Sequence, residues 1–317
     1  MRISGFSMVR NADSLYYPIK QAIASILPIV DEFVLALGDC TEGDRTREEV
    51  LSLNSPKLRI IDTVWDLHTY PNGMENAHQT DIAREACSGD WLFYLQADEV
   101  VHEQDLDTIV SRCEQLLEDP DVEGLLFDYY HFWGDYTHHQ KSHGWYPHEI
   151  RIIRNDPDIH SWESAQSFRR IPNFDGLTYR QQAGTSKLKV AKANASIYHY
   201  GWVRPPALMQ NKRKALDTIH KGSDKVRAMY AHDASEFDYG PLNLCSRFEG
   251  SHPEVMREWI ERFDWSDALR EGGPLPKNRM RFKHEKLKYR IVTWIEQHLL
   301  NGRRLGEFQN YQLLTDK

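Results

Sequence analysis

The sequence of 317 residues lacks several features that would place it in a familiar class of protein. Its four cysteines lie far apart and form no CxxC pair, which argues against a disulfide framework and against a structural zinc site. No run approaches the roughly 18 apolar residues that a membrane-spanning helix needs. No apolar signal core precedes the strand-like segment at residues 2–9, so a cytoplasmic protein is expected.

Positive charge and glycine-rich phosphate loops are also scarce. The net charge of -8 argues against a nucleic-acid binder that works by neutralising phosphates. Neither GxGxxG nor GxxxxGK[ST] follows the first strand-like segment, so the dinucleotide-binding fingerprint and the P-loop are both absent. This absence disfavours a nucleotidyltransferase. A bound nucleotide would have to be held by scattered side chains.

Apolar patterns through about residue 128 predict strands that alternate with helices. Strands are predicted at residues 2–9, 33–37, 58–61, 91–95 and 122–127. Helices are predicted between them, for example over residues 19–30 and 77–88. Such alternation is typical of an α/β protein whose parallel sheet is built with right-handed crossovers.

The composition changes after residue 128. Residues 128–149 hold seven aromatic side chains and five histidines. The histidines from 138 to 148 are expected in a flexible acceptor loop, because a zinc site needs ligands that converge. Tyr129, Trp133 and Trp145 would serve equally well to stack on a sugar or to pack in a core, and both interpretations stay open. Further strands are predicted at 150–154 and 195–202.

The pattern of residues 207–317 predicts a mostly helical region. One apolar stripe in it is made by Leu287, Ile291, Trp294 and Leu299, and basic residues flank it between 277 and 304. Such a stripe can rest on an anionic membrane surface, or pack on the catalytic domain or a partner subunit. Packing is the favoured interpretation, and a peripheral location at the inner face of a membrane is the alternative.

The most informative stretch runs from Asp90 to Glu103. Its apolar run over 91–95 is of strand length and ends on Gln96-Ala97-Asp98-Glu99. Ligands of parallel sheets bind beyond the carboxyl ends of the strands. Two carboxylates at that place need a positive partner, and a divalent cation that carries a diphosphate would serve. The alternative is an acidic turn that caps the following helix.

Four segments in this order resemble a family-2 glycosyltransferase with the GT-A fold. They are Met8-Val9-Arg10-Asn11-Ala12, Val30 to Thr41, Gly89 to Glu99 with its QAD in place of the usual acidic triplet, and Ile197-Tyr198-His199-Tyr200. The resemblance covers roughly residues 1–202. It implies a mostly parallel sheet flanked by helices, with a C-terminal helical extension.

The resemblance also implies a division of the chain. We expect a catalytic domain over 1–205, with a nucleotide-binding half at 1–128 and an acceptor and metal half at 129–205. A mainly helical region, 206–317, would follow it and provide the membrane contact or a homo-oligomer interface.

An inverting transferase of this kind moves a sugar from a nucleotide-diphosphate donor to a glycan or other acceptor hydroxyl, in polysaccharide or glycoconjugate biosynthesis. No nucleic-acid partner is expected. A divalent cation, Mn²⁺ or Mg²⁺, would offset the charge of the leaving diphosphate. Asp98 is the candidate for its main ligand and His199 for its second. Because Gln96 contributes no charge, the alternative is a non-catalytic nucleotide- or glycan-binding protein on a decayed transferase fold.

The remaining candidate residues are carboxylates and one arginine. Asp39 is the carboxylate nearest to Leu37, where many members of the family place an Asp, and it is expected to contact the base or ribose. A general base must come within hydrogen-bond reach of the acceptor oxygen, and Glu163 and Glu149 are the candidates. The candidate nucleotide-binding residues are Arg10, Asp39, Asp62, Asp81, Gln96 and Asp98.

Overall fold

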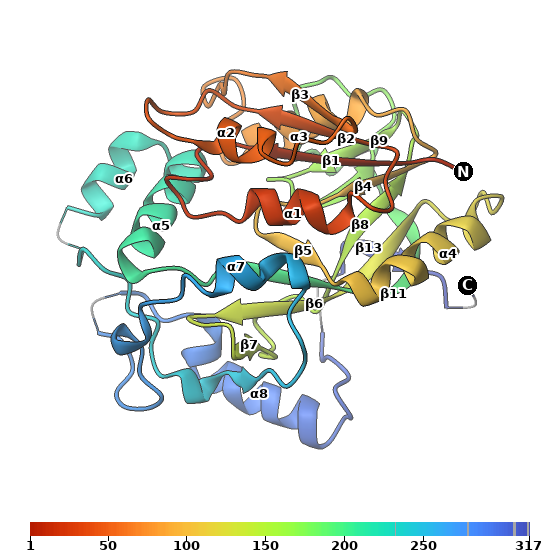
Figure 1. The fold of residues 1–317 in the computed structure, drawn as a ribbon. Helices are drawn as coiled ribbons and strands as arrows, with labels where there is room; N and C mark the ends of the chain where they lie inside the picture. Colours follow the sequence, from red (N-terminus) through yellow and green to blue (C-terminus); the bar gives the residue numbers. More distant parts are fainter. Residues whose placement is uncertain (232, 278, 307–308, 316) are drawn as a thin grey trace.

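The computed structural model describes residues 1–231, 233–277, 279–306, 309–315 and 317. Within these residues the chain has an α/β fold, in which helices flank one large β-sheet (Figure 1). The strands are β1 (Ile3–Val9), β2 (Glu32–Leu37), β3 (Leu58–Asp62), β4 (Trp91–Tyr94), β5 (Glu99–Val101), β6 (Gly124–Trp133), β7 (His138–Gln140), β8 (His148–Arg154), β9 (Ile159–Trp162), β10 (Ser167–Arg170), β11 (Ser186–Trp202), β12 (Ser246–Arg247) and β13 (Tyr311–Leu313). The helices are α1 (Ile19–Ile26), α2 (Thr46–Leu51), α3 (Met74–Glu85), α4 (Leu106–Leu116), α5 (Pro206–Lys221), α6 (Ser223–Met229), α7 (Arg257–Ile260) and α8 (Leu287–His298). Short 3-10 turns are η1 (Glu103–Asp105), η2 (Leu242–Leu244), η3 (Glu254–Met256), η4 (Ser266–Ala268) and η5 (Lys283–Glu285).

The N-terminal half of the sheet is parallel and confirms the alternation predicted from the sequence. Its strand order is β3-β2-β1-β4, and each neighbouring pair is parallel. Phe6 in β1 lies opposite Val34 on one side and Tyr94 on the other. β1, β2 and β4 are buried because helices cover both of their faces, which is why they read as continuous apolar runs, whereas the edge strand β3 is only partly buried.

The second half of the sheet is mixed. β8 runs antiparallel between β4 and β6, while β6 and the long strand β11 are parallel. β5 adds to β11 in antiparallel register, with Val100 opposite Tyr198. This last pairing brings the residues that follow β4 against the C-terminal end of β11.

Two apolar layers sandwich the sheet. On one face α1 and α4 pack through side chains such as Ile23 and Ile109, which are fully buried. On the other face α3 packs together with β9 and β10, for example through Ala83 and Phe168. Figure 1 shows α1 and α4 along the near side of the strands.

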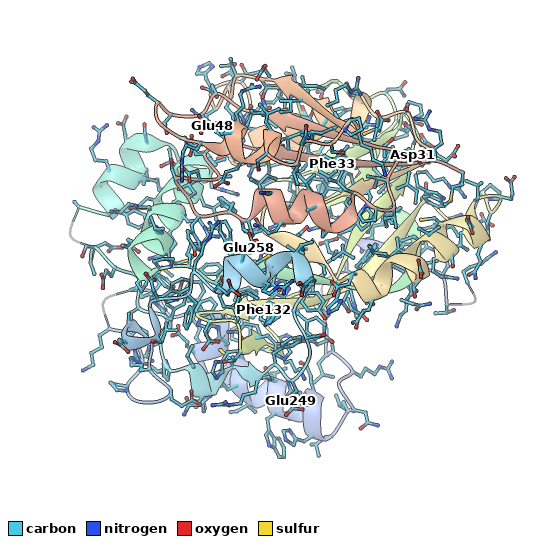
Figure 2. All side chains as sticks on the ribbon, viewed as in Figure 1. Asp31, Phe33, Glu48, Phe132, Glu249 and Glu258 are labelled. Carbon is cyan, nitrogen blue, oxygen red and sulfur yellow. The ribbon has the colours of Figure 1, made fainter. Side chains whose placement is uncertain are left out.

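Several aromatic side chains of the stretch after residue 128 belong to the core, whereas Tyr146 is 38% exposed. β6 extends through it, and Phe132 and Trp133 are both fully buried. Figure 2 shows Phe132 inside the molecule, as is Phe33 in the parallel half, whereas Glu249 lies at the periphery. For Trp133, packing therefore prevails over the alternative of sugar stacking. Tyr129 is likewise buried, at 8% exposure.

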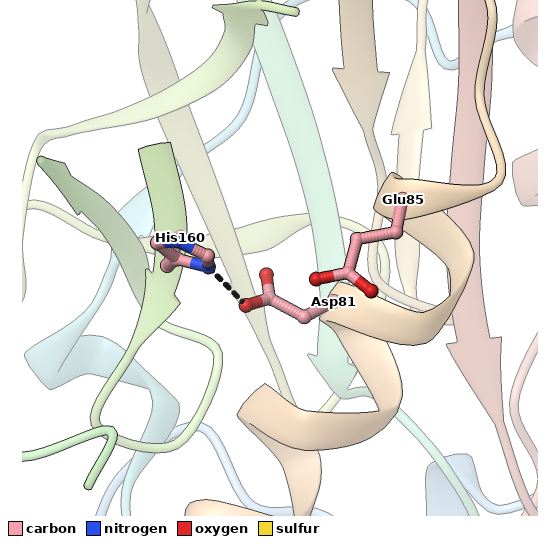
Figure 3. Close-up of side chains that lie close together, drawn as sticks. All are labelled: Asp81, Glu85 and His160. Carbon is pink, nitrogen blue, oxygen red and sulfur yellow. Dashed lines mark hydrogen bonds and ion pairs between the residues drawn. The ribbon is translucent and has the colours of Figure 1, made fainter. Parts of the chain in front are cut away.

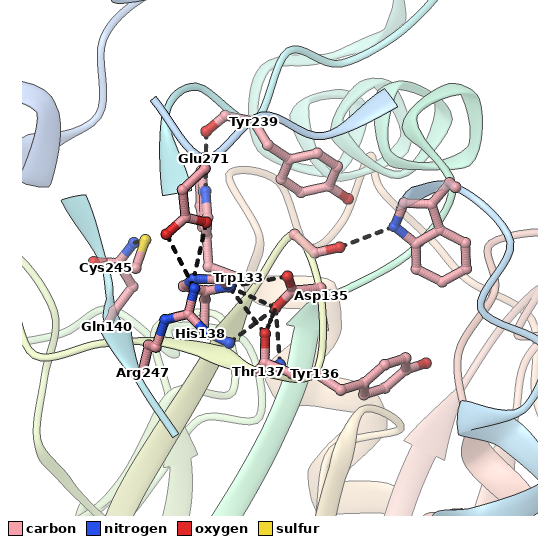
Figure 4. A network of polar contacts seen from close by, with 12 residues as sticks. Trp133, Asp135, Tyr136, Thr137, His138, Gln140, Tyr239, Cys245, Arg247 and Glu271 are labelled. Atoms are coloured by element: carbon pink, nitrogen blue, oxygen red, sulfur yellow. Dashed lines mark hydrogen bonds and ion pairs between the residues drawn. The ribbon is translucent and has the colours of Figure 1, made fainter. Parts of the chain in front are cut away.

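The histidines of this stretch do not form the flexible loop that the sequence predicted. His138 and His139 lie in β7, which pairs with β6 and β12, and both are buried. Asp135 holds His138 through a 2.9 Å ion pair to Nδ1, and Glu271 approaches the other ring nitrogen (Figure 4). The pairing of β7 with β6 and β12 and the contact of His138 with Asp135 hold this stretch in place, although His138 Nε2 and His139 Nδ1 have no hydrogen-bond partner in the described residues.

The C-terminal region is less helical than its pattern predicted. Helices α5 and α6 end at Met229, and the next long helix, α8, begins at Leu287. Between them lie the short helix α7, 3-10 turns and irregular segments. Prolines explain this, because each removes a backbone donor and restricts the preceding residue. They stand at Pro241, Pro253, Pro274 and Pro276. Two segments of the region also join the sheet as β12 and β13.

Candidate functional site

A cavity of about 510 Å³ opens beyond the carboxyl ends of β1 and β4. Residues 8–11, which end β1 and follow it, form one wall, and residues 96–98, which follow β4, form the floor. Helix α5 supplies the opposite wall. This is the place where parallel sheets bind ligands, because neighbouring strands deliver their following loops to one edge.

Asp98 is the only carboxylate among the described residues that line this cavity. Its side chain is 4% exposed and lies between two different neighbours. Oδ1 faces His199 Nε2 at 3.7 Å, and Oδ2 faces the Lys212 ammonium at 3.3 Å. Burial alone would raise the pKa of Asp98, but the neighbouring cations, Lys212 first, lower it to about 2. Asp98 is therefore ionised at neutral pH.

The pairing of β5 with β11 creates the contact between Asp98 and His199. His199 lies opposite Glu99, and the Tyr200 amide donates to the Asp98 carbonyl at 2.8 Å. Gly201 is required at the next position, because a Cβ there would lie 2.5 Å from His199 Nε2 and 2.7 Å from Asp98 Oδ2. The two side chains can meet only over a residue without a side chain.

The tautomer of His199 follows from its neighbour His131. Burial lowers the pKa of both imidazoles, so both are neutral at neutral pH. His131 Nε2 lies 2.7 Å from the Tyr146 carbonyl, which can only accept, so Nε2 carries the proton. His131 Nδ1 is then an acceptor for His199 Nδ1–H at 3.0 Å. His199 Nε2 consequently presents a lone pair to the cavity.

Two buried cations lie behind the carboxylate. Lys212 Nζ donates to the Gly201 carbonyl at 2.6 Å and lies 8% exposed in the cavity wall. Arg204 is fully buried, and its Nη1 donates to the Leu15 carbonyl at 2.8 Å. Its Nη2 lies 4.0 Å from Asp98 Oδ2 and has no hydrogen-bond partner in the described part of the chain. Burial and the Arg204 charge lower the pKa of Lys212 to about 7. An anion in the cavity would stabilise the charged lysine.

Glu99, the second carboxylate of the acidic tip, belongs to the core. Arg151 binds it with two hydrogen bonds of 2.7 and 2.8 Å, and the Tyr129 hydroxyl donates a third. Both charged side chains are fully buried. Glu99 also accepts a hydrogen bond of 3.0 Å from the backbone N–H of Gln96, so it stabilises the turn that positions Asp98. Its role is therefore structural.

The predicted nucleotide-binding residues are distributed unevenly around the cavity. Arg10 and Gln96 line it. Asp39 lies behind Arg10, with Oδ2 3.2 Å from its guanidinium and Oδ1 accepting from the Trp65 amide. Asp62 points outward, is 73% exposed and pairs with Arg47. It therefore stands apart from the cavity.

Asp81 lies on α3 and belongs to a separate cluster in which Asp81 and His160 are buried and Glu85 is exposed. Together with Glu85 and His160 it forms the one group of three potential metal-ligating side chains found in the described residues (Figure 3). Its oxygens already accept from Arg84 Nε, the Ser161 amide and His160 Nδ1, each at 2.9 Å. Arg84 compensates the charge of both carboxylates, so this cluster serves to join α3 to β9.

The two predicted general bases lie off the cavity. Glu149 and Glu163 do not occur among its described lining residues, although Ser164 and Gln166 do. Burial raises the pKa of Glu149, and Arg151 opposes this effect. Glu163 adopts a φ of 57° in the turn between β9 and β10. Their assignment as bases stays a prediction.

Sequence reasoning missed three groups that the cavity contains. Lys212 and His220 project from α5, and Trp65 lies on the other side beside Arg10. A partial signal was present, because basic residues follow the His199 segment at positions 204 and 212. Nothing local relates them to Asp98, which is more than a hundred residues earlier.

Comparisons with known proteins return solved structures only. No protein-family model and no curated protein sequence matches the chain. Glucosyl-3-phosphoglycerate synthase from Mycobacterium tuberculosis, in complex with Mn²⁺, UDP-glucose and glycerol 3-phosphate, is 18% identical over 41% of this chain and 44% of its own, with a TM-score of 0.29. TarS from S. aureus is 13% identical over 73% of this chain and 43% of its own, with a TM-score of 0.38. A shorter TarS, residues 1–349 in complex with UDP, is 12% identical over 73% and 71%, with a TM-score of 0.38.

This chain spans less than half the length of the synthase and of the longer TarS. One of these structures contains a bound nucleotide sugar, UDP-glucose.

Proposed function

We propose that the chain transfers a sugar from a nucleotide-diphosphate donor to an acceptor hydroxyl, with inversion, in the assembly of a polysaccharide or glycoconjugate. One observation carries the proposal. An ionised carboxylate, a lone-pair imidazole nitrogen and a buried lysine amine, which a bound anion would keep charged, converge at Asp98, His199 and Lys212 on the floor of a cavity beyond the parallel strands. A diphosphate is the ligand whose charge and oxygen atoms match this set.

Lys212, in the cavity wall, would bind the diphosphate, and Arg204, buried behind Asp98 and outside the cavity lining, would add positive charge. Lys212 and Arg204 together outnumber the single carboxylate at the floor of the cavity. Charge-assisted hydrogen bonds from such cations to phosphate oxygens are about twice as strong as neutral ones. Held in this way, the diphosphate becomes a better leaving group, because the charge that develops on it meets fixed cations at no cost in reorganisation.

The donor set at Asp98 also fits a divalent cation. Asp98 Oδ1 and His199 Nε2 face each other at 3.7 Å, and neither atom carries a proton there. An oxygen and an imidazole nitrogen suit Mn²⁺, whereas Mg²⁺ prefers oxygen alone. Asp98 and His199 would hold the cation, with phosphate oxygens as further ligands. When bound, it would supply Lewis-acid stabilisation of the leaving diphosphate.

The nucleoside would bind against the cavity wall that the end of β1 forms. Arg10 lies 5.6 Å from the Trp65 ring, and Asp39 holds both through its two oxygens. A base or ribose can contact this group through hydrogen bonds to Arg10 or Asp39 and by stacking on the indole. Asp62 and Asp81 have no place in this arrangement.

The base for the acceptor hydroxyl would come from α5. His220 Nδ1 lies 3.0 Å from the Leu216 carbonyl, so Nδ1 carries the proton and Nε2 keeps a lone pair. His220 lines the cavity, whereas Glu149 and Glu163 do not. Inversion requires the base on the face of the sugar opposite to the diphosphate, and the distance from His220 to the acceptor oxygen decides its role.

The alternative is a non-catalytic nucleotide- or glycan-binding protein, for which the neutral Gln96 is the supporting feature. Isothermal titration with UDP, GDP and other nucleotides, with and without Mn²⁺, tests the shared binding step. Failure of every nucleotide to bind would contradict the transferase and a nucleotide-binding protein, and would leave only the glycan-binding form of the alternative. Turnover of the matching nucleotide sugar above background supports the transferase, and binding without turnover supports the alternative.

His131 sets the tautomer of His199, the proposed second ligand of the cation. In His131→Leu, His199 loses its acceptor, so Nε2 no longer reliably presents a lone pair. We expect the affinity for Mn²⁺ in the presence of nucleotide to fall by about 10- to 100-fold, as for other hydrogen-bond partners of metal-ligating histidines. Titration of Mn²⁺ followed by electron paramagnetic resonance measures this.

His131→Gln is the matched control, because the amide oxygen can accept the same N–H. It is expected to restore most of the Mn²⁺ affinity. An equal loss of Mn²⁺ affinity in both variants would show that His131 acts through packing. Unchanged Mn²⁺ affinity in both would contradict the proposed placement of protons on His131 and His199.

A further inference from the structure

Helix α8 buries the polar residue Glu296 and exposes large apolar side chains on its other side. Glu296 is 1% exposed, accepts from His143 Nδ1 at 2.7 Å and pairs with Arg304 at 3.3 Å. Thr293 accepts from the His143 amide at 2.9 Å. The helix is therefore fastened to the body of the protein by hydrogen bonds and an ion pair, on the side where a surface helix normally buries apolar groups.

The outward side carries large apolar residues. Leu287 is 69% exposed, Ile291 52%, Trp294 54% and Leu299 65%. The spacing of four and three residues places Leu287, Ile291 and Trp294 along one side of the helix, and Leu299 follows its last residue, His298. Met280 and Leu305, also exposed, lie just before and after it in the sequence. Exposed apolar side chains gathered along one side of a helix mark an interaction site.

The charge around this surface is of one sign. Residues 277–304 contain nine Lys and Arg but only two carboxylates, whereas the whole chain carries a net charge of -8. Both carboxylates, Glu285 and Glu296, are buried and paired with arginines. Lys288 and Arg290 are exposed and, by helical periodicity, flank the apolar side. The exposed charge of this segment is thus entirely basic within the described residues.

We propose that α8 docks this protein on an anionic lipid surface. Leucine, isoleucine and tryptophan would enter the boundary between headgroups and acyl chains, and the flanking Lys and Arg would meet the lipid phosphates. A second copy of the chain fits less well, because two basic faces would repel each other. The acidic remainder of the molecule is repelled by the same lipids, so the contact has one orientation. Nowhere in the described residues does a helix combine the length and apolar character that a bilayer crossing requires.

Sedimentation with vesicles tests the proposal. The full chain is expected to bind vesicles of mixed phosphatidylglycerol and phosphatidylcholine, to bind phosphatidylcholine alone weakly, and to dissociate as salt screens the charges. Lys288→Glu with Arg290→Glu should weaken partitioning by at least about fivefold per charge removed. Lys225→Glu with Arg227→Glu, exposed residues on α6, is the matched control of equal charge change.

The apolar contribution is tested separately. Ile291→Glu with Trp294→Glu is expected to abolish vesicle binding, whereas Leu177→Glu, at a residue 49% exposed in a distant loop, should not. Circular dichroism confirms that each variant is folded. Absence of binding to anionic vesicles by the unaltered chain overturns the proposal. A concentration-dependent dimer, seen by light scattering and lost in Ile291→Glu, would assign the surface to a second copy instead.

Discussion

Asp98→Asn is expected to reduce sugar transfer by about 100-fold or more, because it removes the single carboxylate of the cavity floor while keeping its shape. Nucleotide affinity is expected to change in a different way. The variant leaves Lys212 and Arg204 without their counter-charge, so a diphosphate should bind at least as tightly in the absence of metal. The enhancement of binding by Mn²⁺ should be lost. Transfer assays and titration calorimetry with the same nucleotide measure the two effects.

This separation distinguishes a direct role from general damage. Two buried cations without a counter-charge also destabilise the fold, by about 3–5 kcal/mol when a buried pair is broken. A urea denaturation curve therefore accompanies the assay, and Asp121→Asn, at an exposed residue paired with Lys189, is the control. An Asp98→Asn variant with full metal-dependent turnover would remove Asp98 from the site we propose.

Lys212→Met is expected to weaken binding of the nucleotide diphosphate by about 10- to 100-fold, which corresponds to the loss of hydrogen bonds to a charged group. Methionine keeps the length of the side chain and its apolar contact with the cavity wall. The same variant should bind Mn²⁺ more tightly without nucleotide, because an ammonium group 3.3 Å from Asp98 no longer repels the cation. Calorimetry with nucleotide alone, and with Mn²⁺ alone, gives the two affinities.

Lys214→Met, one half-turn along α5, is the matched control, because Lys214 does not occur among the described residues of the cavity lining. It should leave both affinities unchanged. Unaltered nucleotide binding in Lys212→Met would contradict the assignment of Lys212 to the diphosphate. A loss of Mn²⁺ affinity without nucleotide would show that the lysine helps to arrange the metal ligands rather than opposing the ion.

Local pattern was sufficient for the parallel half of the sheet and for the place of the acidic tip. The strand that ends before Gln96 could be predicted because burial on both faces demands a continuous apolar run. The position of Asp98 at the edge of the sheet follows from that strand and from the parallel topology. The resemblance added His199. For the C-terminal region the pattern was less informative, since prolines interrupt what apolar spacing alone would make helical.

The partners of each charge were decided by the tertiary structure. Asp98 and Glu99 are adjacent in the sequence and equal in chemistry, yet Glu99 is sealed against Arg151 in the core while Asp98 faces the cavity. Asp81 was expected to bind the nucleotide, but in the structure its carboxylate accepts a hydrogen bond from His160 on a distant strand.

The amino-acid sequence by itself determined which residues form strands and where an acidic group ends the central one, because these depend on neighbours within a few positions. Only the tertiary structure decided that Lys212 meets Asp98, that His131 sets the proton on His199, and that α8 faces outward with its apolar side. Each of these features depends on contacts between segments far apart in the chain, so no local sequence pattern predicts it.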